Sequence, residues 1–129
     1  MEARGGEITE QILGAAIAVH RALDPGLLES TYEACLAYEL LERRLRFERQ
    51  ASLPIVDRGV RIDCGYRLDL VVEGLVVVEI KAVERMLSIH EAQILTYLKL
   101  PGLPVGLLLN FNVPMMREGI RRFVHDPPP

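Results

Sequence analysis

The stretch Arg67-Leu68-Asp69-Leu70-Val71-Val72-Glu73-Gly74-Leu75-Val76-Val77-Val78-Glu79-Ile80-Lys81 predicts two antiparallel strands joined by a tight turn, because apolar residues alternate on both sides of a glycine. The length of the turn decides which side chains share a face of the sheet. A two-residue turn at Glu73-Gly74 would place Asp69 and Glu79 on opposite faces. A three-residue loop, Val72-Glu73-Gly74, would place both acids on one face.

The three-residue loop gives the more coherent sheet, so we expect it. With Gly74 in the left-handed conformation, Asp69 lies opposite Val77 and Arg67 lies opposite Glu79. One face is then apolar and carries Leu68, Leu70, Val72, Val76, Val78 and Ile80. The other face carries Arg67, Asp69, Val71, Val77, Glu79 and Lys81.

The second face has the groups that a metal site needs. Two carboxylates on neighbouring strands, with an ammonium two residues after one of them, suit a hard divalent cation beside a phosphate. Mg²⁺ requires only one or two carboxylates and activates a bound water, which Lys81 would orient. The alternative is a solvated face on which Arg67 and Lys81 pair with Asp69 and Glu79, and the D-x9-E-x-K spacing alone does not separate the two interpretations.

Hydrophobic periodicity places helices on both sides of this hairpin in the chain. Helices are predicted at 7–23, ending at Asp24-Pro25-Gly26, and at 27–44. Strands are predicted at 47–56, 60–72, 75–83 and 105–111, with a short last element at 119–124 and a turn at Asp57-Arg58-Gly59. The expected fold class is α/β, a mixed central sheet flanked by helices in the order α-α-β-β-β-α-β.

The helix after the hairpin has an explicit start signal. Ser88 and Glu91 fit a capping box, and Pro101-Gly102 ends the helix. Its apolar stripe consists of Ile89, Ala92, Leu95 and Leu98.

Composition and charge indicate one globular domain of 129 residues, with its core at about 7–124. Half of the residues are apolar, but no apolar run reaches the roughly 18 residues of a membrane span. The net charge of -3 provides no general attraction for polyanions, so contact with nucleic acid has to be local or assisted by a metal.

Features of the termini and the cysteines indicate a cytoplasmic protein. Met1–Glu7 lacks the basic flank and apolar stretch of a secretory signal. Cys35 and Cys64 fit no zinc or disulfide spacing, and we expect two buried thiols. The ends, Met1–Gly6 and Asp126–Pro129, are candidates for disorder.

Several motifs resemble the PD-(D/E)xK nuclease-like superfamily. Asp69 followed by Glu79-Ile80-Lys81 looks like its central motif, although Leu68 precedes Asp69 where the name has proline. Gly26-Leu27-Leu28-Glu29-Ser30-Thr31-Tyr32 matches the G-x-x-E-x-x-Y signature of one small-protein family in that superfamily. Gln93-Ile94-Leu95-Thr96-Tyr97 resembles the Q-x-x-x-Y element of RecB-like nucleases, and 89–111 resembles the C-terminal half of the G-x-x-E-x-x-Y family. The resemblance covers about 7 to 124.

This resemblance implies a restriction-endonuclease-like core with a Mg²⁺ or Mn²⁺ site. It implies that Asp69, Glu79 and the Ile80 carbonyl bind the metal and that Lys81 is catalytic. Glu29 would be the upstream acid that completes the metal shell or holds a metal-bound water. Substrate contacts are expected from Gln93, Tyr97, Tyr32 and His90. Considered without the resemblance, an exposed Glu29, a core Tyr32 and a surface His90 are the simpler interpretations.

Two classes of function follow from these expectations. The first is a metal-dependent phosphodiesterase that hydrolyses nucleic acid, with DNA expected ahead of RNA, alone, as a homodimer or with a protein partner. The second is a non-catalytic nuclease-like module for binding or assembly. Candidates for phosphate contact are Arg43, Arg44, Arg46 and Arg49, and also Arg117, Arg121 and Arg122, although such clusters are more often solvated. With four tyrosines, three phenylalanines and no tryptophan, we do not expect an aromatic platform for single strands.

Overall fold

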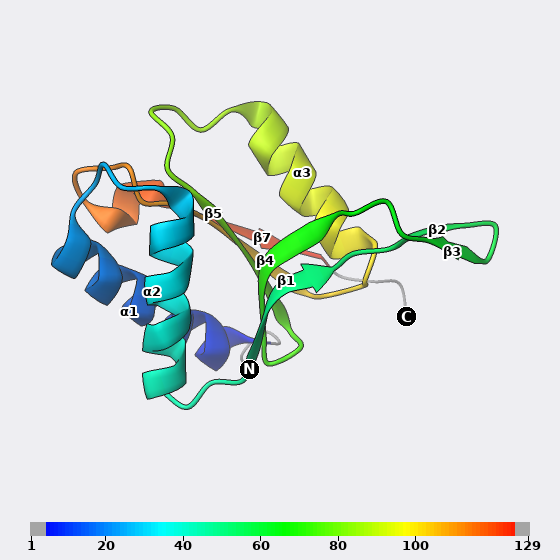
Figure 1. Cartoon of the computed structure of the whole chain (residues 1–129), viewed down its shortest axis with the longest axis horizontal. Helices are drawn as coiled ribbons and strands as arrows, with labels where there is room; N and C mark the ends of the chain where they lie inside the picture. The colour runs from blue at the N-terminus through cyan, green and yellow to red at the C-terminus, as the bar shows by residue number, and fades with distance from the viewer. Residues whose placement is uncertain (1–4, 126–129) are drawn as a thin grey trace.

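The computed structural model describes residues 5–125, which form a five-stranded mixed sheet with helices on both faces (Figure 1). The sheet order is β1-β4-β5-β6-β7. Its strands are β1 (Phe47–Ser52), β4 (Arg67–Val72), β5 (Val76–Lys81), β6 (Val105–Asn110) and β7 (Ile120–Val124). Only β5 and β6 are parallel, and α3 (Ser88–Lys99) provides the crossover that parallel neighbours require.

Two apolar clusters pack on the two faces of the sheet. α1 (Gly6–Leu23) and α2 (Glu29–Glu42) cover one face, and α3 covers the other (Figure 1). The larger cluster lies under α1 and α2 and includes Ile12, Tyr32, Leu36, Leu70, Val78, Leu107 and Phe111. The smaller cluster lies under α3 and joins Val77 and Leu98 to Ala51, Leu53 and Leu68. This α/β architecture confirms the predicted fold class and is consistent with a restriction-endonuclease-like core.

A two-stranded arm, β2 (Ile55–Asp57) and β3 (Val60–Ile62), projects from the sheet (Figure 1). The predicted turn at Asp57-Arg58-Gly59 closes this hairpin. The predicted strands 47–56 and 60–72 each break where the arm begins, because Pro54 has no N–H to donate to a ladder and Asp63 forms a side-chain turn with the Gly65 N–H. The short last element predicted at 119–124 is β7, and a 3₁₀ turn (Met116–Gly119) that was not predicted precedes it.

The β4–β5 hairpin has three residues between its last paired positions, as predicted, but they are Glu73, Gly74 and Leu75. Gly74 is left-handed, with a φ of 62°. Because Val72 pairs with Val76, the register places Asp69 opposite Glu79, two residues from the predicted partner. A shift of two residues keeps the alternation of faces, so the two acids still share one face.

The predicted apolar face is wrong at Leu68. This residue packs with Ala51 and Val77 in the smaller cluster, not with Leu70 in the larger one. Gln50 stands opposite Asp69 in the β1–β4 register and has a φ of 49°, which interrupts the regular alternation at this point.

α3 begins where predicted, but its cap and its buried stripe differ from the prediction. The Leu87 N–H donates to His90 Nδ1 at 3.1 Å, and Leu87 rather than Ser88 is the N-cap residue. Ile94 and Leu98 are buried, whereas Ile89 is 64% exposed. The Ile94 and Leu98 side chains pack closely over Gly106 of β6, where the missing Cβ leaves room for the helix. Hydrophobic periodicity does not reveal such a position.

Cys35 is half-buried but Cys64 is exposed, which corrects the expectation of two buried thiols. No described helix is long and apolar enough to cross a lipid bilayer. The predicted disorder of the ends falls largely on residues 1–4 and 126–129, outside the described residues, and Gly6 already belongs to α1.

Candidate functional site

At Asp69 and Glu79, hydrogen bonds to the two side chains replace the backbone hydrogen bonds between β4 and β5. Asp69 Oδ2 accepts a hydrogen bond from the Ile80 N–H at 2.8 Å. Glu79 Oε1 accepts one from the Asp69 N–H at 3.3 Å. The two carboxylates are therefore each anchored to the backbone of the other strand and lie side by side.

Burial disfavours the ionised form of Glu79 in this pair. Glu79 is 8% exposed, and Asp69 is half-buried. Burial first, and then the negative charge of Asp69, raise the pKa of Glu79 to about 9 from its ordinary 4.5. The positive charge of Lys81 lowers this pKa by less. A cation between the carboxylates would remove the repulsion, so the charge of the pair suits cation binding.

The donor set fits a hard divalent cation. Among residues 5–125, no three His, Cys, Asp or Glu side chains gather as a metal cluster, so the protein ligands on offer are two carboxylates and nearby backbone oxygens. The N–H and C=O of one strand residue point toward the same neighbouring strand, so the Ile80 carbonyl faces the same opening as the Ile80 N–H. Mg²⁺ commonly uses one or two carboxylates and retains waters, and this set is sufficient for it.

Lys81 ends β5, two residues after Glu79. None of the three ion pairs in the described part of the chain involves Lys81. Asn110 pairs with Lys81 in the β5–β6 register and is buried. Its Oδ1 accepts from the Val83 N–H at 3.1 Å, and its Nδ2 donates to the Val83 carbonyl at 2.9 Å. Asn110 thereby fixes the chain just after Lys81.

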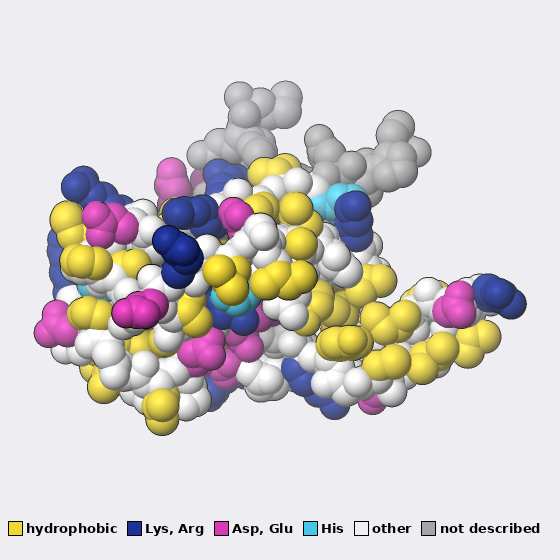
Figure 2. Space-filling view, turned by 90° about the horizontal axis from the view of Figure 1, so that it is seen from above, with side chains coloured by type: hydrophobic (Ala, Val, Ile, Leu, Met, Phe, Trp, Pro, Cys, Tyr) yellow, Lys and Arg dark blue, Asp and Glu magenta, His cyan; other side chains and the backbone are white. Residues whose placement is uncertain are grey.

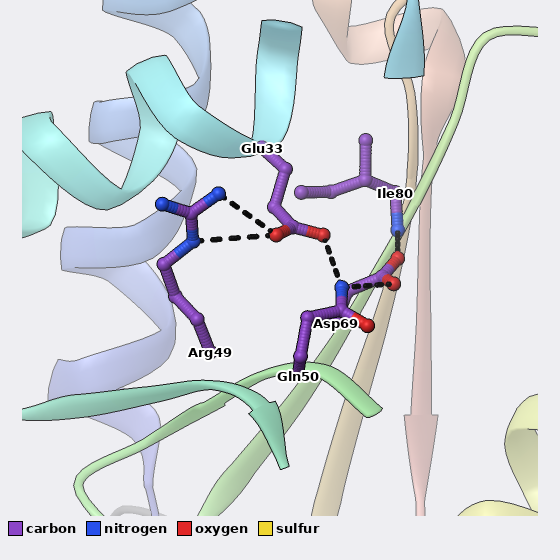
Figure 3. Close-up of polar contacts among 5 residues, drawn as sticks. All are labelled: Glu33, Arg49, Gln50, Asp69 and Ile80. Atoms are coloured by element: carbon purple, nitrogen blue, oxygen red, sulfur yellow. Dashed lines mark hydrogen bonds and ion pairs between the residues drawn. The ribbon is translucent and has the colours of Figure 1, made fainter. Parts of the chain in front are cut away.

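Glu33 and Gln50 link α2 to Asp69, one member of the carboxylate pair (Figure 3). Gln50 Nε2 donates to Glu33 Oε1 at 2.7 Å and, at 3.4 Å, to Asp69 Oδ1. Arg49 donates two hydrogen bonds to Glu33 Oε2, at 3.1 and 3.3 Å. Glu33 is 8% exposed, and these bonds satisfy its charge. The acid of α2 that reaches the site is therefore Glu33.

The structure does not bring Glu29 or Tyr32 to the carboxylate pair. Glu29 is exposed at the first residue of α2. Tyr32 is fully buried, stacks on Phe111 with ring centroids 4.7 Å apart, and donates its hydroxyl to the Asp24 carbonyl at 2.6 Å. A ring in this position stabilises the α1–α2 loop and has no surface for substrate, which corrects the expectation that Tyr32 contacts it.

The α3 candidates lie closer to the site. Burial, followed by the negative charge of Glu79, raises the pKa of the Tyr97 hydroxyl, and a hydrogen bond with Gln93 opposes this effect. Tyr97 is half-buried and Gln93 is exposed. His90 is half-buried at the helix start, where its Nδ1 accepts from the Leu87 N–H.

The first arginine cluster is partly neutralised within the protein. Arg49 pairs with Glu33, and Arg43 lies 3.6 Å from Glu39. Arg44 and Arg46 of that cluster are exposed, as are Arg117, Arg121 and Arg122.

Three residues that shape the site were not predicted: Glu33, Gln50 and Asn110. Glu33 had a signal, because it stands in the apolar spacing of Leu36, Ala37 and Leu40, where a charge needs a partner. Gln50 is identified only by the β1–β4 register, and Asn110 only by the loop that it binds.

Comparison with protein-family models identifies the superfamily of the chain. A family model described as the PD-(D/E)XK nuclease superfamily matches residues 6–123. The chain therefore belongs to the PD-(D/E)XK nuclease superfamily. Searches of the curated proteins and of the solved structures gave no significant match.

Proposed function

We propose that the protein is a Mg²⁺- or Mn²⁺-dependent nuclease whose site consists of Asp69, Glu79 and Lys81. The observation that carries this proposal is the carboxylate pair, in which Glu79 is buried and its pKa is raised, with Lys81 two residues away. Membership of a nuclease superfamily supports the same chemistry. As in the sequence-based expectation, DNA is the first substrate to test, ahead of RNA.

The roles of the residues follow from their positions. Asp69, Glu79 and the Ile80 carbonyl would hold the metal, which when bound supplies Lewis-acid activation of a water and of a phosphoryl oxygen. Lys81 would orient the attacking water or stabilise negative charge on the phosphate. Glu33, acting through Gln50, would fix the orientation of Asp69. This differs from the role expected for Glu29, which was to complete the metal shell or hold a metal-bound water. Gln93 and Tyr97 would contact the substrate strand.

A second candidate is a nuclease-like module that acts only with a protein partner or as a homodimer. The projecting arm favours it, because Val56, Val60 and Ile62 are 53%, 59% and 43% exposed. Apolar surface on an isolated two-stranded hairpin is typical of an interaction surface.

Cleavage of labelled single-stranded DNA, double-stranded DNA and RNA in Mg²⁺ and in Mn²⁺ tests the proposal. We expect cutting by the wild type and a loss of at least about 100-fold in Lys81→Ala and Asp69→Asn, the scale typical of lost electrostatic stabilisation. Lys99→Ala and Asp57→Asn are the matched controls, because both side chains are exposed and lie outside the site.

The outcomes separate the candidates. Cutting that persists in Lys81→Ala and Asp69→Asn would identify a contaminant. If no protein cuts any substrate, but Mg²⁺ raises the melting temperature of the wild type and not of Asp69→Asn, the partner-dependent candidate is favoured. The absence of both effects would overturn the metal site itself.

A further inference from the structure

A cavity of about 300 Å³ opens between α3 and the base of the β2–β3 arm. Its walls include Tyr66, Ile89, Gln93, Thr96 and Tyr97. This volume is at the small end of the range for ligand sites, which suits one ring system with its sugar rather than a length of chain.

The cavity is neutral and lies beside the charged site. None of its lining residues is Asp, Glu, Lys or Arg. Tyr97 connects the two regions, because it lines the cavity and also packs against the smaller apolar cluster, which includes Leu68 and Val77. These two residues lie on β4 and β5, the strands that carry Asp69 and Glu79. A nucleotide has the same division, a neutral flat base next to a charged phosphate.

Two large apolar side chains that line this cavity are exposed to solvent. Ile89 is 64% exposed and Tyr66 is 47% exposed, although α3 buries Ile94 and Leu98 elsewhere. Figure 2, which looks down on the α3 side, shows hydrophobic side chains continuing from the body of the molecule onto the projecting arm. Such surface beside a candidate active site indicates a ligand contact.

Polar groups are also available at the wall. The Gln93 amide is exposed and offers both donors and an acceptor. Thr96 Oγ1 donates to the Ala92 carbonyl at 3.1 Å, which leaves its lone pairs free to accept.

We infer that this cavity binds one unpaired nucleobase of the substrate strand, next to the phosphate that is cleaved. The inference rests on the proposed nuclease function and narrows its substrate class. The base stacks on Tyr66 or Tyr97, and the Gln93 amide binds its edge. This is a single stacking position and not the extended aromatic platform that the composition disfavours. A paired base cannot enter such a cavity without leaving the duplex, so the strand is unpaired at the cleaved position.

The test is to fill the cavity without touching the core. Ala92→Phe places a ring in the cavity, and Leu95→Phe, on the same helix but outside the cavity, is the matched control. Both are made in the Lys81→Ala background so that the strand stays intact, and thermal melting checks that both fold. Anisotropy of labelled single-stranded DNA, single-stranded RNA and blunt duplex DNA measures binding.

We expect Ala92→Phe to weaken single-strand binding about tenfold or more, the scale of one stacked base, and Leu95→Phe to change it less than about twofold. Tyr66→Ala should weaken single-strand binding similarly. An oligonucleotide carrying 5-iodouracil should photocrosslink to Tyr66 or Tyr97. Equal effects of the two phenylalanine variants, tighter binding of duplex, crosslinks elsewhere, or no nucleic-acid binding would each overturn the inference. The DNA and RNA arms identify which sugar is accepted.

The cleavage experiment keeps the two proposals distinguishable. Loss of single-strand binding in Ala92→Phe together with an inactive wild type would retain the base site and remove the nuclease. Metal-dependent, Lys81-dependent cutting that Ala92→Phe leaves unchanged would retain the nuclease and remove the base site.

Discussion

Gln50 connects α2 to the carboxylate pair by hydrogen bonds. Its amide donates to both Glu33 and Asp69 from a backbone with positive φ, a conformation that few non-glycine residues adopt. This backbone conformation is strained, and the two hydrogen bonds that it allows the side chain to make offset the strain.

We predict that Gln50→Ala folds but binds Mn²⁺ about 10- to 100-fold more weakly, the usual cost of losing a partner of a metal ligand. Calorimetric titration measures the affinity. Glu48→Ala, an exposed neighbour on β1, is the control and should bind Mn²⁺ as the wild type does. Equal affinities in Gln50→Ala and the wild type would show that Asp69 needs no support from α2.

Asn110 is a second residue whose side chain fixes the backbone beside the site. It is buried and makes three hydrogen bonds to the backbone at Val83 and Asn112. We predict that Asn110→Ala lowers the free energy of unfolding by about 1–3 kcal/mol, because buried backbone groups lose their partner. Urea denaturation measures this, and Asn112→Ala should cost less because only its backbone N–H is used. A neutral Asn110→Ala would mean that water replaces the side chain.

Among the elements, the β2–β3 arm contributes least to the core. Every residue of β3 is exposed, and β2 has only Ile55 half-buried. The sheet pairing resumes at Ser52 and Arg67, below the arm.

We therefore predict that replacing residues 55–62 with a short glycine-rich turn leaves the melting temperature within a few degrees of the wild type. Circular dichroism and thermal melting check this. Leu98→Ala provides the contrast, since removing a buried leucine should cost about 2–5 kcal/mol. An unfolded arm-deletion variant would show that the arm covers more of the core than its exposure indicates.

The elements also show how far the sequence specifies this fold. The helices and the β4–β5 hairpin follow from periodicity and from Gly74, because these signals are local. The buried face of α3 does not, because it depends on Gly106 in a strand that lies next to the helix only after folding.

The site shows the same limit. Alternation placed Asp69 and Glu79 on one face, and this parity survived a register error of two residues. The residues that orient the pair could not be read in the same way, because Glu33 and Gln50 meet Asp69 only through the packing of α2 on β1.

At the scale of the whole molecule, the carboxylate pair lowers the free energy of unfolding when no cation is bound. Because Glu79 is nearly fully buried, its ionised form disfavours the folded state, whereas the unfolded chain exposes it to water. A ligand that binds only the folded state adds stability by mass action, about 2.7 kcal/mol at 100 times its dissociation constant. Metal binding and global stability are therefore coupled.

The pH dependence of unfolding in EDTA tests this coupling. A carboxyl whose pKa rises from 4.5 to about 9 on folding favours the folded state when protonated, so its contribution is complete below about pH 4.5 and is lost as the pH rises toward 9. Glu79→Gln has no such titration, and comparing it with the wild type cancels all other groups. We predict that Glu79→Gln becomes the more stable protein by at least about 1.4 kcal/mol, one pKa unit, between pH 5 and pH 8. Saturating Mg²⁺ should remove most of this difference in the wild type, because the cation compensates the ionised pair. A stability difference that stays constant with pH would show that Glu79 is ionised in the metal-free protein and that the pair is already compensated.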